Sequence, residues 1–256
     1  MGNRKDYHTY PFNKKDLRIS KLKVKLLKYT PNPELLCAAA AMTSYKSEGT
    51  SKLLERLNLE KARKTLRRVM SSGHHSVIEH ASFTFSVEGV SRALTHQLVR
   101  HRIASYTQQS QRYVTYDTLE RYVTPPSVLE NEEAKKIYDE TLMKMSDTYQ
   151  KLLKHEVPKE DARFILPNAA KTNILITMNA RELRHFFNLR CCVRSQWEIR
   201  EMAIEMLRLA KRAAPVIFEN AGPSCIELGY CPEGVLKDPT CKIEEIKKKF
   251  MKLNGS

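Results

Sequence analysis

The 256-residue sequence has little glycine, and its glycines lack the spacing of the common nucleotide-binding loops. It contains eight glycines and one tryptophan. No GxGxxG and no GxxxxGK[ST] motif occurs. Such loops let a backbone approach phosphate closely in Rossmann and P-loop proteins. A nucleotide that binds this chain therefore needs another device.

Long apolar runs are also missing. No stretch approaches the roughly 20 residues of a membrane span, and the first twenty residues lack the apolar segment of a signal peptide. Hydrophobic residues make up 41% and charged residues 29%, as in soluble globular proteins. We expect a cytoplasmic protein with no membrane partner. Its six cysteines then need not form a disulfide framework.

The spacing of histidine and cysteine does not match the usual metal motifs. The histidines of residues 74–101 include no HExxH, so we predict no catalytic metal. The cysteines at 225, 231 and 241 show no CxxC, although a structural ion there stays an alternative. Cys191 and Cys192 adjoin Arg190, and burial is the simpler interpretation of both thiols.

Positive charge is abundant, with a formal net charge of +15 and a pI near 9.5. An anionic partner is expected, either a nucleotide or a nucleic acid. The densest cluster is "LVRHRIASYTQQSQRY", residues 98–113. Arginine forks beside hydroxyls and amides suit phosphate or carboxylate. We read the second half of this cluster, from Ser105 on, as a loop.

Hydrophobic periodicity predicts an α+β fold, a single domain with an antiparallel or mixed sheet flanked by long helices. The pattern of period two predicts strands at 21–30, 83–87 and 173–179. Helices are predicted at 32–47, 54–73, 91–102, 128–157, 180–190 and 195–215, with a short one near 159–167. Ser76 with Glu79, and Ser195 with Glu198, have capping-box spacing.

The cluster resembles a known family at this point. "RHRIASYTQQS" is similar to the RHR-x7-S signature of the flavin-dependent thymidylate synthases. "SGHHSVIEHASFTF", "ARFILP", "NARELRHFFNLR" and "QWEIR" are similar to the family's other blocks, in the same order. The resemblance covers roughly residues 38–213. It implies reductive methylation of dUMP to dTMP, with methylenetetrahydrofolate as carbon donor and FAD reduced by NADPH.

The resemblance also implies a homotetramer with active sites at subunit junctions, and it allocates residues to each ligand. The residues that it places at FAD are Ser44, His74, Ser76, Glu79, Arg100, His101, Arg102, Ile103, Gln108, Asn179, Arg181, His185, Leu189 and Arg194. Those that it places at dUMP are Gln97, Arg100, Gln108, Gln109, Ser110, Gln111, Arg112, Arg163 and Arg190.

Arg190 and Ser110 are the candidate catalytic residues, Arg190 for enolate charge at a uracil carbonyl. We expect the two halves of the 98–113 cluster to hold two ligands side by side. Residues 1–220 are expected to form the synthase domain and 221–256 a basic, cysteine-containing extension. The alternative function is a nucleic-acid-binding protein, because Tyr106, Tyr113, Tyr116 and Tyr122 are interleaved with arginine.

Overall fold

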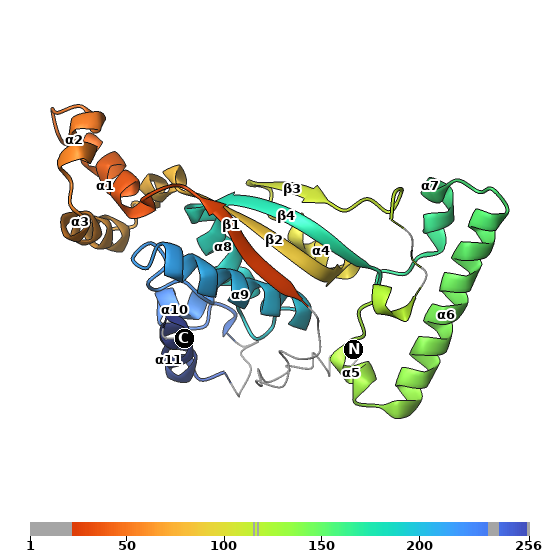
Figure 1. The fold of residues 1–256 in the computed structure, drawn as a ribbon. Helices are drawn as coiled ribbons and strands as arrows, with labels where there is room; N and C mark the ends of the chain where they lie inside the picture. Colours follow the sequence, from red (N-terminus) through yellow and green to blue (C-terminus); the bar gives the residue numbers. More distant parts are fainter. Residues whose placement is uncertain (1–21, 115, 117, 235–240, 255–256) are drawn as a thin grey trace.

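A four-stranded antiparallel sheet forms the centre of the computed structural model, which describes residues 22–114, 116, 118–234 and 241–254 (Figure 1). The strand order is β1-β2-β4-β3. The strands are β1 (Lys23–Tyr29), β2 (Ser82–Ser91), β3 (Ala104–Gln108) and β4 (Lys171–Asn179). The predicted α+β fold is confirmed. The basic residues 1–20 lie outside the described residues.

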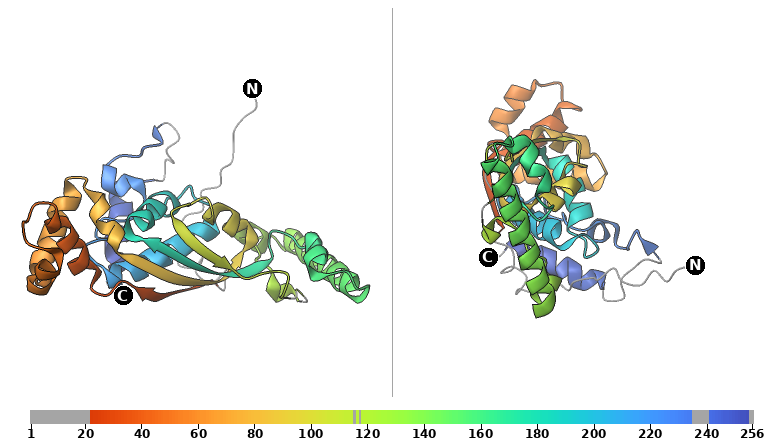
Figure 2. Two further views of the ribbon diagram at one scale, coloured as in Figure 1. Left: turned by 90° about the horizontal axis from the view of Figure 1, so that it is seen from above. Right: turned by 90° about the vertical axis from the view of Figure 1, so that its right-hand side faces the viewer.

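Helices gather on one face of this sheet and at its two ends. They are α1 (Pro33–Thr43), α2 (Thr50–Arg56), α3 (Leu59–Ser71), η2 (His75–His80), α4 (Arg92–Leu98), η3 (Leu119–Arg121), α5 (Pro126–Leu129), α6 (Glu132–Lys154), α7 (Lys159–Ala162), η4 (Arg163–Ile165), α8 (Ala180–Arg190), α9 (Trp197–Ala213), α10 (Ser224–Leu228), α11 (Ile243–Met251) and η6 (Lys252–Asn254). Helices α4, α8 and α9 pack on the sheet. Helices α1–α3 lie at one end and α5–α7 at the other, which makes the molecule elongated (Figure 2). No helix in the described ranges is long and apolar enough to cross a bilayer.

Alternation in the strands directs apolar side chains to the helical side, as the sequence predicts. Phe83, Phe85 and Val87 of β2 are fully buried, and they pair in register with β4. The register shifts between Val87 and Val90, where Gly89 has a φ of 78°. Glycine adopts this left-handed conformation without steric cost, so the bulge forms there.

Three predicted helix starts are wrong in detail. The helix expected over 54–73 is two helices, because Asn58 caps α3 by accepting a hydrogen bond from the Lys61 N–H at 2.9 Å. Gln196, not Ser195, caps α9, and its Oε1 accepts from the N–H groups of Glu198 and Ile199. The side chain of Ser76 caps no helix either, since η2 has no side-chain cap.

The largest correction concerns residues 105–108, which we expected in a loop and which belong to strand β3. β3 pairs with β4 from Ala104↔Met178 to Gln108↔Ile174. Its five residues span roughly 17 Å at the rise of an extended strand. Arg102 and Ser110 thus lie beyond opposite ends of β3, so one protomer does not bring the two halves of the cluster together.

A second, smaller core lies under α6. It is formed by Tyr116, Tyr122, Leu142, Tyr149, Ala162 and Ala170. Ile137 of α6 is exposed, whereas Leu142 and Tyr149 of the same helix are buried. Of the four tyrosines behind the nucleic-acid alternative, Tyr116 and Tyr122 are buried here and Tyr106 is half-buried. Only Tyr113 of the four presents an exposed ring, so the stacking surface that this alternative requires is not formed.

The C-terminal segment packs onto the main core. Ile226 of α10 and Phe250 of α11 are buried in it. The buried ammonium of Lys211 in α9 donates to the carbonyls of Glu219 and Phe250 at 3.1 and 3.0 Å. A functional boundary at residue 220 stays a prediction.

Candidate active site

The predicted site residues form separate groups on the fold. One surrounds His101 where α4 leads into β3, a second lies at η2 and the start of α8, and a third lies beyond the far end of β3. Each is described in turn.

His101 is the buried centre of the first group, with 4% of its surface exposed. Its Nε2 accepts a hydrogen bond from Nε of Arg190 at 3.0 Å, so the proton of the neutral ring is on Nδ1. Oε1 of Glu182 lies 3.5 Å from that Nδ1. The ring also packs edge-on against Phe186, with centroids 4.9 Å apart. Two helical side chains and one aromatic ring therefore fix the orientation of the imidazole.

Burial also changes the acidity of this group. It lowers the pKa of His101 from 6.5 to about 4, and electrostatic interactions with Arg190 and His185 add to the lowering. Burial raises the pKa of Glu182, which the charge of His185 opposes. Burial lowers the pKa of Arg190. His101 is thus neutral at physiological pH and serves as a hydrogen-bond acceptor.

Exposed cations and apolar side chains surround this centre. Arg100 and Arg102 have exposed side chains without a hydrogen-bond or ion-pair partner among the described residues. Ile103 is 68% and Leu189 46% exposed. The ring of His185 lies 5.9 Å from that of His101. Free guanidinium groups beside apolar surface fit a flavin dinucleotide, because the ring needs apolar neighbours and the pyrophosphate needs donors.

The second group lies where η2 meets α8. Glu79 forms an ion pair with Arg181. Asn179 caps α8, and its Oδ1 accepts from the Glu182 N–H at 2.9 Å, which leaves its amide N–H groups available. The side chains of His74 and Ser76 are exposed next to this pair. Ser44 ends α1 and donates to the Ala41 carbonyl.

Two other side chains of this region face elsewhere. Arg194 pairs with Glu233 of the C-terminal segment. Asn188 is turned toward α10 and donates to Glu227 at 3.3 Å. The residue thus helps to hold α10 against α8.

The third group lies beyond β3. Arg112 pairs with the Glu160 carboxylate at 2.7 Å, and Nε of Arg163 donates to the Glu160 carbonyl at 3.0 Å. The hydroxyl of Ser110 accepts from the Arg112 N–H at 3.2 Å. Arg112 and Arg163 thus both contact Glu160, one at its carboxylate and one at its carbonyl, and Ser110 lies next to the Arg112 backbone. This arrangement can hold a phosphate dianion.

The glutamines near this group have different environments. Gln108 is turned inward and donates to Thr95 and Thr172. Gln111 is buried and accepts from Arg92. Gln109 pairs through its backbone N–H with the Asn173 carbonyl. Gln97 lies beside the first group, since its carbonyl is 3.5 Å from an Nη of Arg190.

Glu182 and Glu160 are residues that the sequence analysis missed. Glu182 lies eight residues before Arg190 on α8, a spacing that places both on one helix face. That spacing could have indicated Glu182 from the sequence alone. Glu160 precedes Arg163 by three residues, but its contact with Arg112 depends on the tertiary structure.

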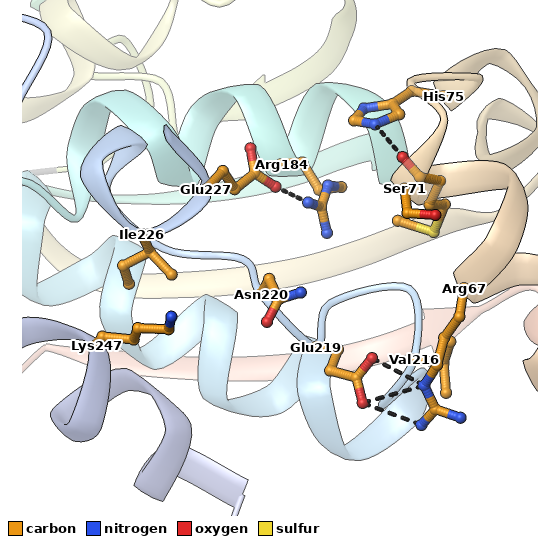
Figure 3. A pocket seen from close by; sticks show the side chains of 11 residues that line it. Arg67, Ser71, His75, Arg184, Val216, Glu219, Asn220, Ile226, Glu227 and Lys247 are labelled. Atoms are coloured by element: carbon orange, nitrogen blue, oxygen red, sulfur yellow. Dashed lines mark hydrogen bonds and ion pairs between the residues drawn. The ribbon is translucent and has the colours of Figure 1, made fainter. Parts of the chain in front are cut away.

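A cavity of about 550 Å³ opens against α8 and is lined by other residues (Figure 3). Arg184 pairs there with Glu227 and donates to the Ile217 carbonyl, and Arg67 is paired with Glu219. None of the lining residues belongs to the three groups, although His75 and Arg184 adjoin predicted residues in the sequence. The described residues include no group of three His, Cys, Asp or Glu side chains that could hold a metal. Cys191 is buried, which raises its thiol pKa and suppresses thiolate formation.

The sequence is similar to known proteins over most of its length. A family model described as thymidylate synthase complementing protein matches residues 25–216. A flavin-dependent thymidylate synthase of Geobacter sulfurreducens is 52% identical over 91% of this chain and 100% of its own. One of Pyrococcus furiosus is 46% identical over 92% of this chain and 99% of its own.

The fold is similar to a solved structure as well. A UMP/dUMP methylase from Streptomyces cacaoi, bound with 5-Br dUMP, superposes with a TM-score of 0.69 at 25% identity. The match covers 78% of this chain and 94% of that one.

Proposed function

Since the chain belongs to the thymidylate synthase complementing protein family, we propose that it converts dUMP to dTMP by reductive methylation. Methylenetetrahydrofolate supplies the carbon, and NADPH the reducing equivalents. Bound FAD carries those equivalents to the uracil ring. The observation that carries the proposal is the pair of guanidinium groups of Arg100 and Arg102, which have no partner within the described part of the chain and lie beside exposed Ile103 and Leu189.

The first two groups are proposed to hold the flavin. Arg100 and Arg102 offer forked donors to the pyrophosphate. Ile103 and Leu189 supply apolar contact, and the amide of Asn179 supplies a polar one. The remaining proposed flavin residues are Ser44, His74, Ser76, Glu79, His101, Gln108, Arg181, His185 and Arg194.

The third group is proposed to hold the dUMP phosphate through Ser110, Arg112 and Arg163. Arg190, with Gln97 and Arg100 beside it, is proposed to face the uracil. Its cationic fork stabilises negative charge that develops on a uracil carbonyl oxygen. Ser110, the second candidate catalytic residue, is proposed to contact dUMP near its phosphate. Gln108, Gln109 and Gln111 are proposed to bind dUMP beside it.

We further propose a homotetramer whose sites lie at subunit junctions. Arg190 and Arg112 belong to groups at opposite ends of β3, whereas a single dUMP must touch both. A site built from two subunits contains both residues, because a symmetric interface can bring Arg190 of one subunit next to Arg112 of another. We propose that the enzyme is cytoplasmic, with residues 1–220 as the synthase domain and 221–256 as an extension.

A visible spectrum of the purified protein tests the proposal. Flavin absorption bands are expected, and they should bleach when NADPH is added anaerobically. Product analysis should then show dTMP only when dUMP and methylenetetrahydrofolate are both present. A colourless protein that also fails to take up added FAD would contradict the proposal.

A further inference from the structure

Three side chains form a chain of contacts that ends at the proposed catalytic guanidinium. Glu182 approaches Nδ1 of His101 at 3.5 Å, and Nε2 of His101 accepts from Nε of Arg190 at 3.0 Å. Glu182 and Arg190 lie eight residues apart on α8, and His101 reaches between them from the segment that follows α4.

We propose that Glu182 and His101 are positioning residues for Arg190, which they hold in the orientation that meets the uracil. This inference rests on the proposed function. Neither residue touches the substrate in this scheme. Glu182 acts through His101 and His101 acts through Arg190, and of these three residues only Arg190 contacts the uracil ring.

The contacts on Arg190 show how the orientation arises. His101 holds Nε, and the Gln97 carbonyl lies 3.5 Å from one terminal nitrogen, Nη2. Nη1 has no hydrogen-bond partner among the described residues. Two anchored nitrogens fix the plane of the guanidinium, so the free one points in a set direction. Such preorganisation spares the cost of ordering a long side chain during the reaction.

The arrangement depends on one tautomer of His101. Nε2 can accept from Arg190 only if the ring proton is on Nδ1, and a carboxylate oxygen next to Nδ1 favours that form. An amide in place of the carboxylate can donate to Nδ1 and stabilise the other tautomer. The ring would then point an N–H at the N–H of Arg190. The same loss of a tautomer explains why replacing the aspartate of a serine protease triad with asparagine strongly lowers kcat.

The surroundings keep the chain of contacts intact at physiological pH. The titratable or charged groups that face His101 are Glu182, His185 and Arg190 of α8, and the Tyr106 hydroxyl of β3, which donates to the His101 carbonyl at 2.8 Å. Burial and the neighbouring cations keep the imidazole neutral. A proton on Nε2 would remove the acceptor and place a second cation beside Arg190.

The test compares Glu182→Gln with Glu182→Asp in the holoenzyme. We expect Glu182→Gln to lower kcat roughly tenfold, as is common when a partner that orients a functional group is lost. Flavin content and the KM for dUMP should change less than twofold. Glu182→Asp keeps a carboxylate and should recover part of kcat. Glu198→Gln is the matched control, because that buried carboxylate binds Ser91, away from Arg190, and it should leave kcat unchanged.

A double-mutant cycle identifies the route of the effect. In an Arg190→Ala background, Glu182→Gln should change the residual kcat less than twofold, since the residue through which it acts is absent. An equal loss in both backgrounds would overturn the proposal. So would an unchanged kcat in Glu182→Gln, or loss of bound flavin in both Glu182 variants.

A wild-type enzyme that makes no dTMP contradicts the proposed function itself, whereas an active wild type with an unaffected Glu182→Gln contradicts only the inference.

Discussion

At the scale of residues, burial determines what His101 can do. A surface histidine would exchange protons near pH 6.5, whereas burial lowers the pKa of His101 to about 4. The unfolded chain therefore binds a proton between these pH values that the folded chain does not. By linkage, stability rises with pH across this window and is lost as the pH falls from about 6.5 to about 4.

Replacing His101 should reduce this acid sensitivity. His101→Gln keeps an acceptor near Arg190 but cannot titrate. We expect its free energy of unfolding to fall less steeply than that of the wild type between pH 6.5 and 4.5. Denaturant unfolding at several pH values measures the difference in slope. Equal slopes in the two proteins would show that His101 is not the group responsible.

If Arg112 binds the substrate phosphate as proposed, Glu160 competes with that phosphate for the guanidinium. The ion pair is about half exposed on both sides, so it contributes on the order of 0.2–1 kcal/mol. Glu160→Gln should free Arg112 and lower the dissociation constant of dUMP by about 1.4- to 5-fold, the equivalent of that energy. Calorimetric titration measures the change. Asp161→Asn is the control, and weaker dUMP binding in Glu160→Gln than in this control would contradict the expectation.

At the scale of elements, α11 is held to α9 by few contacts. Phe250 supplies the buried ring, and Lys211 donates to its carbonyl. Burial lowers the pKa of Lys211 to about 8, because the charged ammonium loses contact with water. Its hydrogen bonds to the two carbonyl oxygens offset part of that free-energy cost. Gly222 packs so closely that an added Cβ would lie 3.1 Å from Phe250. The C-terminal helix thus depends on a small, tightly packed contact.

Removing the Phe250 ring should release α11 without unfolding the sheet. Phe250→Ala is expected to cost at most about 3 kcal/mol, because a terminal helix can undock locally. Amide hydrogen exchange should show lost protection in residues 243–251 and unchanged protection in β2 and β4. The neighbouring exposed Met251→Ala is the control. Global loss of protection in Phe250→Ala would show that α11 supports the whole core.

At the scale of the whole molecule, the separation of the site residues has a direct consequence. If Arg190 and Arg112 of one site come from different chains, two inactive variants can complement each other. Co-expressed Arg190→Ala and Arg112→Ala chains, tagged differently and purified as hybrids, should regain about a quarter of the wild-type activity under random assembly. A hybrid of Arg112→Ala and Arg163→Ala should regain none, because both residues belong to the same group. Hybrids of the first pair without activity would place both residues in one chain.

Much of the fold follows from local pattern. The alternation around Phe83 and Phe85 predicts β2, and the helical stripe of Ile199, Met202 and Met206 predicts α9, with both apolar faces buried as expected. The predicted helix starts are wrong where another polar residue nearby caps the helix. Asn58 starts α3 inside the single helix that we predicted, and Gln196 caps α9 in place of Ser195. Strand β3 escaped prediction because it is short and most of its side chains are polar, so it lacks an apolar alternation, and its pairing with β4 holds it extended.

The sequence by itself determined the family, the elements with strong periodicity, and which arginines and hydroxyls are present to bind anions. These depend on residue order alone, since periodicity and motif spacing act over a few turns or strand residues. The tertiary structure decided that β3 separates the two halves of the arginine cluster, that Glu182 meets His101, and that Glu160 meets Arg112. Such contacts join residues far apart in the chain, and they exist only after the sheet and α8 have packed together.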